Sequence, residues 1–230
     1  MSLARPLRAI ILGAPGSGKG TVLSKLAKHY ENKLTTVSSG DLLRERINKD
    51  PNSELAAIVS KGRLVSNELI INTIFDRLDH LKLFNDHSSW ILDGFPRNTI
   101  QAKELDERLL YQNLPLNMVI ELDVPFEVIL NRIERRFIHQ PSGRIYNLEY
   151  NPPKVPGKDD ITGEPLTKRP DDNVEVFSQR LDLYSELLVN LRSYYQTKGL
   201  LHTIEGETSD IIFPKLLKLI EEKYNTISVE

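Results

Sequence analysis

Five short runs of apolar and β-branched residues recur along the chain, separated by longer stretches of mixed polarity. These runs are Ala9–Leu12, Leu34–Val37, Trp90–Leu92, Met118–Leu122 and Leu201–Ile204. Short runs without regular polar alternation are typical of strands buried on both faces, as in a parallel sheet. Patterns with helical spacing lie between the runs, so we predict an α/β fold in which helices flank a five-stranded parallel sheet.

The longest helical pattern covers residues 174–195 and has an apolar face with helical spacing. Two other segments depart from the alternation of strands and helices. Residues 39–67 contain two short helical patterns, whereas residues 137–172 are rich in proline and glycine and contain short β-like pieces such as Arg144–Tyr146. We therefore expect a core with a small helical insertion and a loop-rich insertion that contains these β-like pieces.

The amino-acid composition limits the functional classes to which this chain can belong. The chain has 230 residues, of which 40% are apolar and 27% charged, an ordinary balance for a globular protein with a sizeable core. The formal net charge of −2 gives no general attraction to nucleic acid or to a membrane surface. No apolar run approaches the ~20 residues that span a bilayer. Because the chain has no cysteine, disulfides, thiolate metal sites and cysteine nucleophiles are excluded.

The first predicted strand is followed by the glycine-rich stretch G-A-P-G-S-G-K-G-T at residues 13–21, and then by a helical pattern. Glycines let backbone N–H groups converge on an anion, the helix N-terminus adds its dipole, and Lys19 adds a full positive charge. We interpret the stretch as a phosphate-binding loop rather than a glycine turn without a ligand. In the general P-loop pattern a hydroxyl residue follows the lysine. Here Gly20 follows it and Thr21 comes next, a variant similar to that of nucleoside monophosphate kinases.

A second motif, D-G-F-P-R at residues 93–97, follows the predicted strand Trp90–Leu92. An aspartate at the end of a buried strand, beside a phosphate loop, is well placed to hold Mg²⁺ through its water shell. Magnesium sites of this kind use one or two carboxylates together with phosphate oxygens. The alternative is that Asp93 caps a helix, which the following Pro96 and Arg97 disfavour.

Six arginines lie beside loops that the predicted topology directs to the same end of the sheet, where ligands of such sheets bind. Phosphoryl transfer needs positioning and charge stabilisation more than covalent chemistry, and guanidinium groups bind phosphate oxygens with two donors at once. Any one of these arginines alone would more often form a surface salt bridge. The prediction therefore depends on the whole set, which is Arg44, Arg97, Arg132, Arg136, Arg169 and Arg180.

In their order and spacing these motifs resemble the adenylate kinase family over essentially the whole chain. Besides the glycine-rich loop, the resemblance is carried by S-S-G-D-L-L-R at 38–44, G-R-L-V at 62–65, D-G-F-P-R at 93–97 with Gln101, H-Q-P-S-G-R-I-Y at 139–146, D-D-I-T-G at 159–163 and R-P-D-D at 169–172. The resemblance implies the long-lid form of the family. In that form a P-loop NTPase-like core is made of residues 1–38, 68–134 and 173–230, with an AMP-binding domain at residues 39–67 and a β-rich lid at residues 135–172.

The resemblance also implies roles for individual residues. Donor-nucleotide binding is implied for Gly16, Ser17, Gly18, Lys19, Gly20, Thr21, Arg132, Arg136, Ile145, Tyr146 and Thr208. AMP binding is implied for Ser39, Arg44, Arg63, Leu64, Val65, Gly94, Arg97, Gln101, Arg169 and Arg180. The implied catalytic group is Lys19, Arg97, Arg136, Arg169 and Arg180, and the implied holders of Mg²⁺ are Asp93, through water, and Thr21. The amide of Gln101 suits adenine because it offers both a donor and an acceptor to the N6/N1 edge.

Some members of the family hold the lid with a zinc ion bound by four cysteines, which this chain lacks. His139, Ser142, Asp159 and Thr162 stand at the corresponding positions. We expect these side chains to form a hydrogen-bonded network without zinc, because a lone histidine and aspartate are more often ordinary polar residues than metal ligands.

The loop after the last predicted strand, residues 205–210, bears on the donor nucleotide. Its E-G-E-T sequence resembles the GTP:AMP phosphotransferases of the mitochondrial matrix, and acceptor-rich side chains suit the N1–H and N2–H₂ donors of guanine. We therefore expect reversible transfer of the γ-phosphoryl group of Mg-GTP to AMP, giving GDP and ADP. One alternative is an ATP:AMP phosphotransferase. Another, from a different class, is a nucleotide-hydrolysing switch, for which the guanine-reading N-K-x-D motif is absent.

The expected compartment follows from the same subfamily resemblance. It implies a monomer in the mitochondrial matrix, with a cytoplasmic location as the alternative. The N-terminus is basic and has no acidic residue before Glu31. Such a segment is either a solvated arm or an uncleaved mitochondrial signal.

Overall fold

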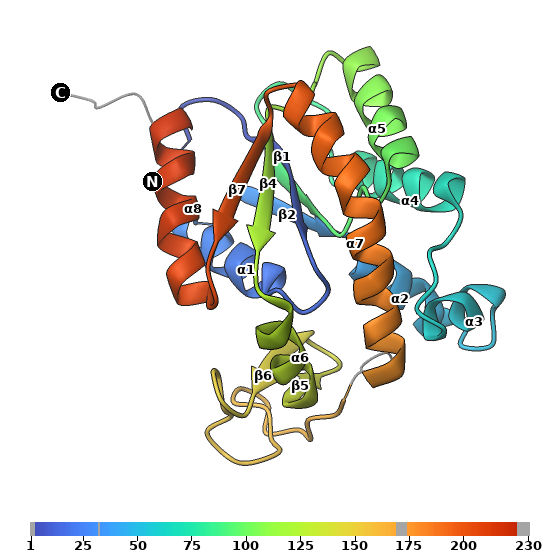
Figure 1. The fold of residues 1–230 in the computed structure, drawn as a ribbon, viewed down its shortest axis with the longest axis vertical. Coiled ribbons are helices and arrows are strands. Elements are labelled where there is room, and N and C mark those ends of the chain that lie inside the picture. The colour runs from blue at the N-terminus through green and yellow to red at the C-terminus, as the bar shows by residue number, and fades with distance from the viewer. Residues whose placement is uncertain (1–2, 32, 169–173, 225–230) are drawn as a thin grey trace.

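The computed structural model describes residues 3–31, 33–168 and 174–224, and Figure 1 shows how their helices and strands are arranged. The predicted five-stranded parallel sheet is confirmed. Its strands are β1 (Arg8–Gly13), β2 (Leu34–Ser38), β3 (Ser89–Asp93), β4 (Met118–Asp123) and β7 (Leu201–Glu205), in the spatial order β2-β3-β1-β4-β7. Because β1 pairs with both β3 and β4, the glycine-rich loop that follows β1 lies at the middle of the sheet's carboxyl end.

Strand β1 illustrates why the apolar runs show little polar alternation. Ala9 and Ile11 share one core with helices α1 (Lys19–His29) and α8 (Ser209–Tyr224). Ile10 and Leu12 share a second core with α4 (Asn67–His80), α5 (Thr99–Tyr111) and α7 (Val174–Thr197). Successive side chains of a strand point to opposite faces, so a strand between two helical layers is apolar at every position. Each fully buried aliphatic side chain contributes about 1.5–3 kcal/mol to stability.

The insertion between β2 and α4 is helical, as its two short patterns predict. It forms α2 (Ser39–Lys49) and α3 (Glu54–Ser60). A serine hydroxyl begins each helix: Ser38 accepts the N–H of Asp41, and Ser53 accepts the N–H of Ala56, both at 3.3 Å. These caps explain why the chain turns from strand into helix at these points.

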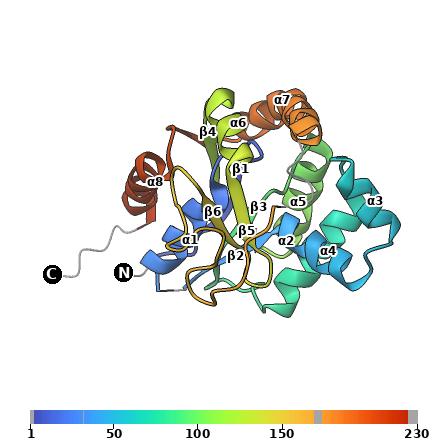
Figure 2. The same ribbon diagram turned by 90° about the horizontal axis from the view of Figure 1, so that it is seen from below.

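Helix α6 (Phe126–Glu134) leads from β4 into a small antiparallel sheet made of β5 (Arg136–His139) and β6 (Arg144–Asn147). Figures 1 and 2 both place this insertion beyond the carboxyl ends of the parallel strands. The long helical pattern at residues 174–195 is confirmed as α7, which continues to Thr197. The division into core, AMP-binding domain and lid stays a prediction. Across the described ranges, no helix is both long and apolar enough to cross a membrane.

Candidate nucleotide-binding site

The glycine-rich loop joins β1 to α1 at the centre of the sheet. Gly16 and Gly18 have φ angles of 80° and 89°, and a Cβ on Gly16 would lie 2.9 Å from Ile129 Cγ2, so this loop requires glycine. Gly18 is the N-cap residue of α1 and provides no side-chain hydrogen bond, whereas helices α2 to α5 are capped by Ser38, Ser53, Ser66 and Asn98. The first N–H groups of α1 therefore have no side-chain cap, and they are available to an anion such as phosphate.

Lys19, the first residue of α1, folds back onto the loop. Its Nζ donates to the carbonyl oxygens of Gly13 at 2.7 Å and Ala14 at 3.0 Å. Removal from water lowers the pKa of Lys19 to about 8. The other charges that act on this pKa come from residues far apart in the chain, namely Asp93, Arg97, Arg180 and Arg136. The structure therefore brings these four predicted residues to the same end of the sheet as Lys19.

Asp93 ends β3 and is the sheet neighbour of Ile11 in β1. Its Oδ1 is buried and has no hydrogen-bond partner among the described residues, and the same is true of the hydroxyl of Ser17 in the loop. Burial raises the pKa of Asp93, while the nearby Lys19 opposes that effect. Buried polar atoms are nearly always paired in folded proteins. Because these two oxygens also lie in or beside the glycine-rich loop and near Lys19, we interpret them as part of a site for a ligand.

The alternative role of Asp93 as a helix cap is wrong. The following helix, α5, is capped by Asn98, whose Oδ1 accepts the N–H of Gln101 at 2.9 Å. The residues present fit a Mg²⁺ ion, because an unpaired carboxylate oxygen is a preferred donor for this ion and Thr21 presents an exposed side chain in the first turn of α1.

The ends of β2 and β3 meet at Gly94. Its carbonyl oxygen accepts hydrogen bonds from the hydroxyl of Ser39 and from Nε of Arg97, both at 2.8 Å. A Cβ on Gly94 would lie 2.8 Å from Ser39 Oγ, so glycine is needed for this approach. Arg44 on α2 acts together with Arg97 on the pKa of Asp93. Four of the residues predicted to bind AMP therefore lie together beside the phosphate loop.

Gln101 is buried, and its amide has protein partners at both ends. Oε1 accepts the N–H of Arg97 at 2.7 Å, and Nε2 donates to Oδ1 of Asn67 at 3.0 Å. Asn67 was not among the predicted site residues, although it follows the G-R-L-V motif by two positions. The reading of adenine by Gln101 stays a prediction. Among the neighbouring predicted residues, Val65 is buried, Leu64 is half-buried and Arg63 is exposed.

Arg132 of α6 connects several segments near the phosphate loop. Its guanidinium donates to the main-chain carbonyl oxygen of Glu207 and lies over the ring of Tyr150, 5.2 Å from the ring centroid. A Cβ on Gly18 would lie 3.8 Å from the same guanidinium. The hydroxyl of Thr208 accepts a main-chain N–H at the start of α8, at 3.3 Å. Tyr150 was not predicted, and no pattern in the sequence around it indicates this contact.

Two predicted donor-side residues lie on β6. Ile145 is half-buried, whereas Tyr146 is buried inside the lid and its hydroxyl donates to Oδ1 of Asp159 at 2.8 Å. The hydroxyl of Tyr146 is therefore used within the lid, and contact of these residues with the donor base stays a prediction.

Asp159 is the centre of a hydrogen-bonded network inside the lid. Arg144 binds both carboxylate oxygens, with Nε 2.7 Å from Oδ1 and Nη2 2.6 Å from Oδ2. The hydroxyl of Thr162 donates to Oδ2 at 3.0 Å. The Arg144 guanidinium, together with these other donors, holds the pKa of Asp159 well below its usual range.

His139 extends this network. Its Nδ1 lies 2.7 Å from the hydroxyl of Ser142, and its Nε2 lies 2.5 Å from a carboxylate oxygen of Glu164. The predicted network of His139, Ser142, Asp159 and Thr162 is confirmed, and Arg144, Tyr146 and Glu164 are further members. Within the described ranges, no group of three or more His, Asp and Glu side chains is arranged to hold a metal ion.

The remaining predicted arginines approach the phosphate loop from two other elements. Arg136 begins β5, Arg180 lies on α7, and both are half-buried. Their positive charges lower the pKa of Lys19. The predicted role of Arg169 falls on a residue outside the described ranges.

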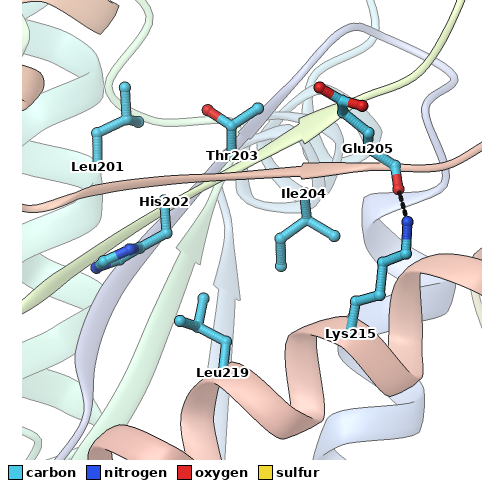
Figure 3. Close-up of a pocket in the computed structure, with 7 residues that line it drawn as sticks. All are labelled: Leu201, His202, Thr203, Ile204, Glu205, Lys215 and Leu219. Carbon is cyan, nitrogen blue, oxygen red and sulfur yellow. Dashed lines mark hydrogen bonds between the residues drawn. The ribbon is translucent and has the colours of Figure 1, made fainter.

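A surface hollow lies away from these residues, along the outer edge of β7 (Figure 3). Lys215 reaches across it, and its Nζ donates to the carbonyl oxygen of Glu205 at 2.8 Å. Because β7 is an edge strand, this contact provides a partner for a carbonyl oxygen of the sheet edge. No predicted site residue in the described ranges lines the hollow, so the candidate site is identified by its chemistry rather than by this concavity.

Comparison with known proteins agrees with this geometry. Residues 11–200 match the family described as adenylate kinase. The chain is 52% identical over 224 residues to a protein named mitochondrial GTP:AMP phosphotransferase from Saccharomyces cerevisiae, covering 96% of this chain and 95% of the relative. It is 40% identical over 222 residues to a protein of the same name from Drosophila melanogaster, covering 95% and 97%. A protein named adenylate kinase from Malassezia globosa is 39% identical over 205 residues, covering 88% and 79%.

Proposed function

Because the chain belongs to the adenylate kinase family and is a nucleoside monophosphate kinase, we propose that it transfers the γ-phosphoryl group of Mg-GTP to AMP. The products are GDP and ADP, and the reaction is reversible. The observation that carries the proposal is the convergence of Lys19 with Asp93, Arg97, Arg136 and Arg180 next to the uncapped N-terminus of α1. Such a concentration of positive charge suits the transfer of a phosphoryl group, which needs positioning and charge stabilisation.

The acceptor is a nucleotide rather than water in this proposal. Ser39 and Arg97 both bond to the carbonyl oxygen of Gly94, and they lie beside the phosphate loop without being part of it. This second group of polar side chains supports a site for the AMP phosphate. A hydrolysing switch would have no use for it.

In the proposed reaction, Lys19 leaves its two carbonyl partners and binds the transferring phosphoryl group, and the arginines neutralise the charge that spreads over its oxygens. Arg169 completes the set by resemblance. Mg²⁺ bound to the triphosphate would neutralise phosphate charge, held by Asp93 through water and by Thr21. Closure of the lid would exclude water and so favour transfer over hydrolysis.

GTP is favoured as donor for two reasons. Two relatives that match at least 95% of the chain carry the name GTP:AMP phosphotransferase. The loop around Glu207 also offers acceptor oxygens to the donor groups of guanine. The relatives' names support a mitochondrial location, and we propose that the protein acts in the matrix as a monomer. The second candidate is an ATP:AMP phosphotransferase, which the adenylate kinase from Malassezia globosa favours.

The donor can be tested with initial rates of AMP phosphorylation by the purified protein, measured with MgGTP and with MgATP at matched concentrations. Faster turnover with GTP is expected. Faster turnover with ATP would contradict the assignment of GTP as donor and would remove the support for a location in the mitochondrial matrix. AMP would remain the acceptor in that case. Hydrolysis of GTP at the same rate with and without AMP would contradict phosphoryl transfer itself.

A further inference from the structure

The turn after α3 touches α7 at Gly62. A Cβ on Gly62 would lie 3.1 Å from Cγ of Arg180, 3.1 Å from Cγ1 of Val176 and 3.3 Å from the carbonyl oxygen of Val176. Two of these neighbours can move, but the carbonyl belongs to the backbone of a 24-residue helix. The helical insertion therefore approaches α7 (Figure 1) so closely that a Cβ at position 62 would fit only if α7 or the turn moved by a few tenths of an ångström.

Crowding distinguishes Gly62 from other glycines with similar backbone angles. Its φ is +69°, close to the +67° of Gly199, and both turns are in the left-handed region that favours glycine. A Cβ on Gly199 would meet nothing within 4 Å, and the same is true of Gly143, Gly157 and Gly163. Backbone conformation alone therefore accounts for glycine at those four positions. At Gly62 a second requirement is added, namely the close approach to α7.

This contact lies between two parts of the candidate site. Arg63, Leu64 and Val65, predicted to bind AMP, follow Gly62 directly. On the other side, Val176 and Arg180 are four residues apart on α7 and so share a face of the helix. The charge of Arg180 acts on Lys19 in the phosphate loop. Gly62 thus contacts the stem of a side chain whose charged end belongs to the phosphoryl-transfer region.

We propose that Gly62 is a positioning residue for phosphoryl transfer. Having no side chain, it allows residues 62–65 to pack against α7, and this packing sets the distance between the acceptor segment and the guanidinium of Arg180. The inference depends on the proposed function, in which Arg180 binds the phosphoryl group passing to AMP. Displacement of about 1 Å in a reacting arrangement can cost a hundredfold in rate. A methyl group at position 62 forces a shift of a few tenths of an ångström, for which we expect about a tenfold loss.

The test compares Gly62→Ala with Gly199→Ala, which introduces the same strain without a neighbour. Both variants should lose thermal stability through the shared backbone strain, and Gly62→Ala should lose more because its methyl group also meets α7. We expect Gly62→Ala alone to lower kcat/KM for AMP about tenfold, with the KM of the donor changed less than twofold. Equal AMP kinetics in the two variants would overturn the inference, as would a parallel rise in both KM values.

A second pair of variants keeps the test decisive if Gly62→Ala folds poorly. Val176→Leu adds bulk from the α7 side while leaving the glycine in place, and it should reproduce the loss that is specific for AMP. Val176→Ala combined with Gly62→Ala removes one crowding atom and should recover part of the activity. Wild-type kinetics in Val176→Leu would count against the positioning role. Failure of the wild-type protein to phosphorylate AMP would instead contradict the proposed function.

Discussion

At the carboxyl end of the main sheet, Ser17 Oγ and Asp93 Oδ1 are buried and have no hydrogen-bond partner among the described residues. In the lid the opposite holds, since the buried carboxylate of Asp159 accepts hydrogen bonds from Arg144, Tyr146 and Thr162. Unpaired buried polar atoms lower stability, whereas a fully bonded network makes one local structure rigid. The two regions therefore use buried polar groups differently: two oxygens beside the phosphate loop are left without a protein partner, whereas the polar groups of the lid maintain its local structure.

The two regions also differ in what holds them together. The core around β1 is made of aliphatic side chains with almost no exposure, such as Ile10 and Ile11, so its stability does not depend on the polar atoms of the site. No described residue between 136 and 168 belongs to either of the two apolar cores, although Ile138 and Tyr146 are buried within the lid. Mutations of polar residues should therefore reduce activity in the first region and stability in the second.

The largest effect is expected for Lys19→Met. Removing the only full charge of the phosphate loop should lower kcat by about 10²–10³-fold, as for the loss of other groups that stabilise a transition state. Because the lysine is buried and its pKa is lowered, the folded protein gains nothing from its charge, and the thermal midpoint should not fall. Steady-state kinetics and thermal unfolding check both parts. A variant that keeps normal turnover would show that the loop does not bind the transferring group.

Arg97→Ala should act on the acceptor side. Hydrogen bonds to charged groups contribute about 1.5–3 kcal/mol, so the KM of AMP should rise roughly tenfold to a hundredfold while the KM of the donor stays nearly constant. The exposed Arg46 on α2 provides a matched control, and Arg46→Ala should leave both constants unchanged. A rise in the donor KM of similar size would contradict the assignment of Arg97 to the AMP site.

Asp159→Asn should weaken the lid and spare the core. The variant keeps the shape of the side chain but loses the charge that pairs with Arg144. Compared with the wild-type protein, backbone amide hydrogens should exchange faster in residues 136–167, while those of β1 and β4 should still exchange slowly. Asp160→Asn, at the exposed neighbouring position, serves as control. Unchanged exchange in the lid would show that the network does not maintain its structure.

The same carboxylate predicts the response of the lid to acid. The pKa of Asp159 is lowered in the folded protein, so its contribution to stability is complete above the ordinary carboxyl pKa of about 3.9. That contribution is lost as the pH falls below this value toward the lowered pKa. The protection of lid amides that Asp159 provides should therefore be complete and independent of pH near neutrality, and hydrogen exchange should show it decreasing only in strong acid.

The smallest expected effect is a proton taken up when the donor binds. With a pKa of about 8, Lys19 is about half protonated at pH 8 in the free protein, and a bound triphosphate favours the charged form. Binding of MgGTP at pH 8 should then take up as much as about half a proton. Calorimetry in two buffers of different ionisation enthalpy measures this uptake, which should disappear in Lys19→Met. Equal uptake in the variant would assign the proton to another group.

Much of the candidate site could be predicted because its signals are local. A strand, a glycine-rich turn and a helix follow one another within residues 8–29, and each is formed by neighbours in sequence. Asp93 was found for the same reason, since it directly follows an apolar run. The lid network was predicted from residues that occupy family positions, but Arg144, Tyr146 and Glu164 were missed. Their hydrogen bonds depend on how β5 and β6 pair and on the loop that returns to them.

The sequence by itself determined the strands of the main sheet, the helices α1, α2, α3 and α7 and the type of chemistry, because apolar periodicity and glycine-rich turns act over a few residues. Only the tertiary structure decided which distant residues meet. It joins Gln101 to Asn67, Arg132 to Tyr150 and Glu207, and Gly62 to Arg180. Such contacts arise from the order of strands in the sheet and from the packing of helices on it. Both depend on long-range burial of apolar surface, which produces no local sequence pattern at the residues that it brings together.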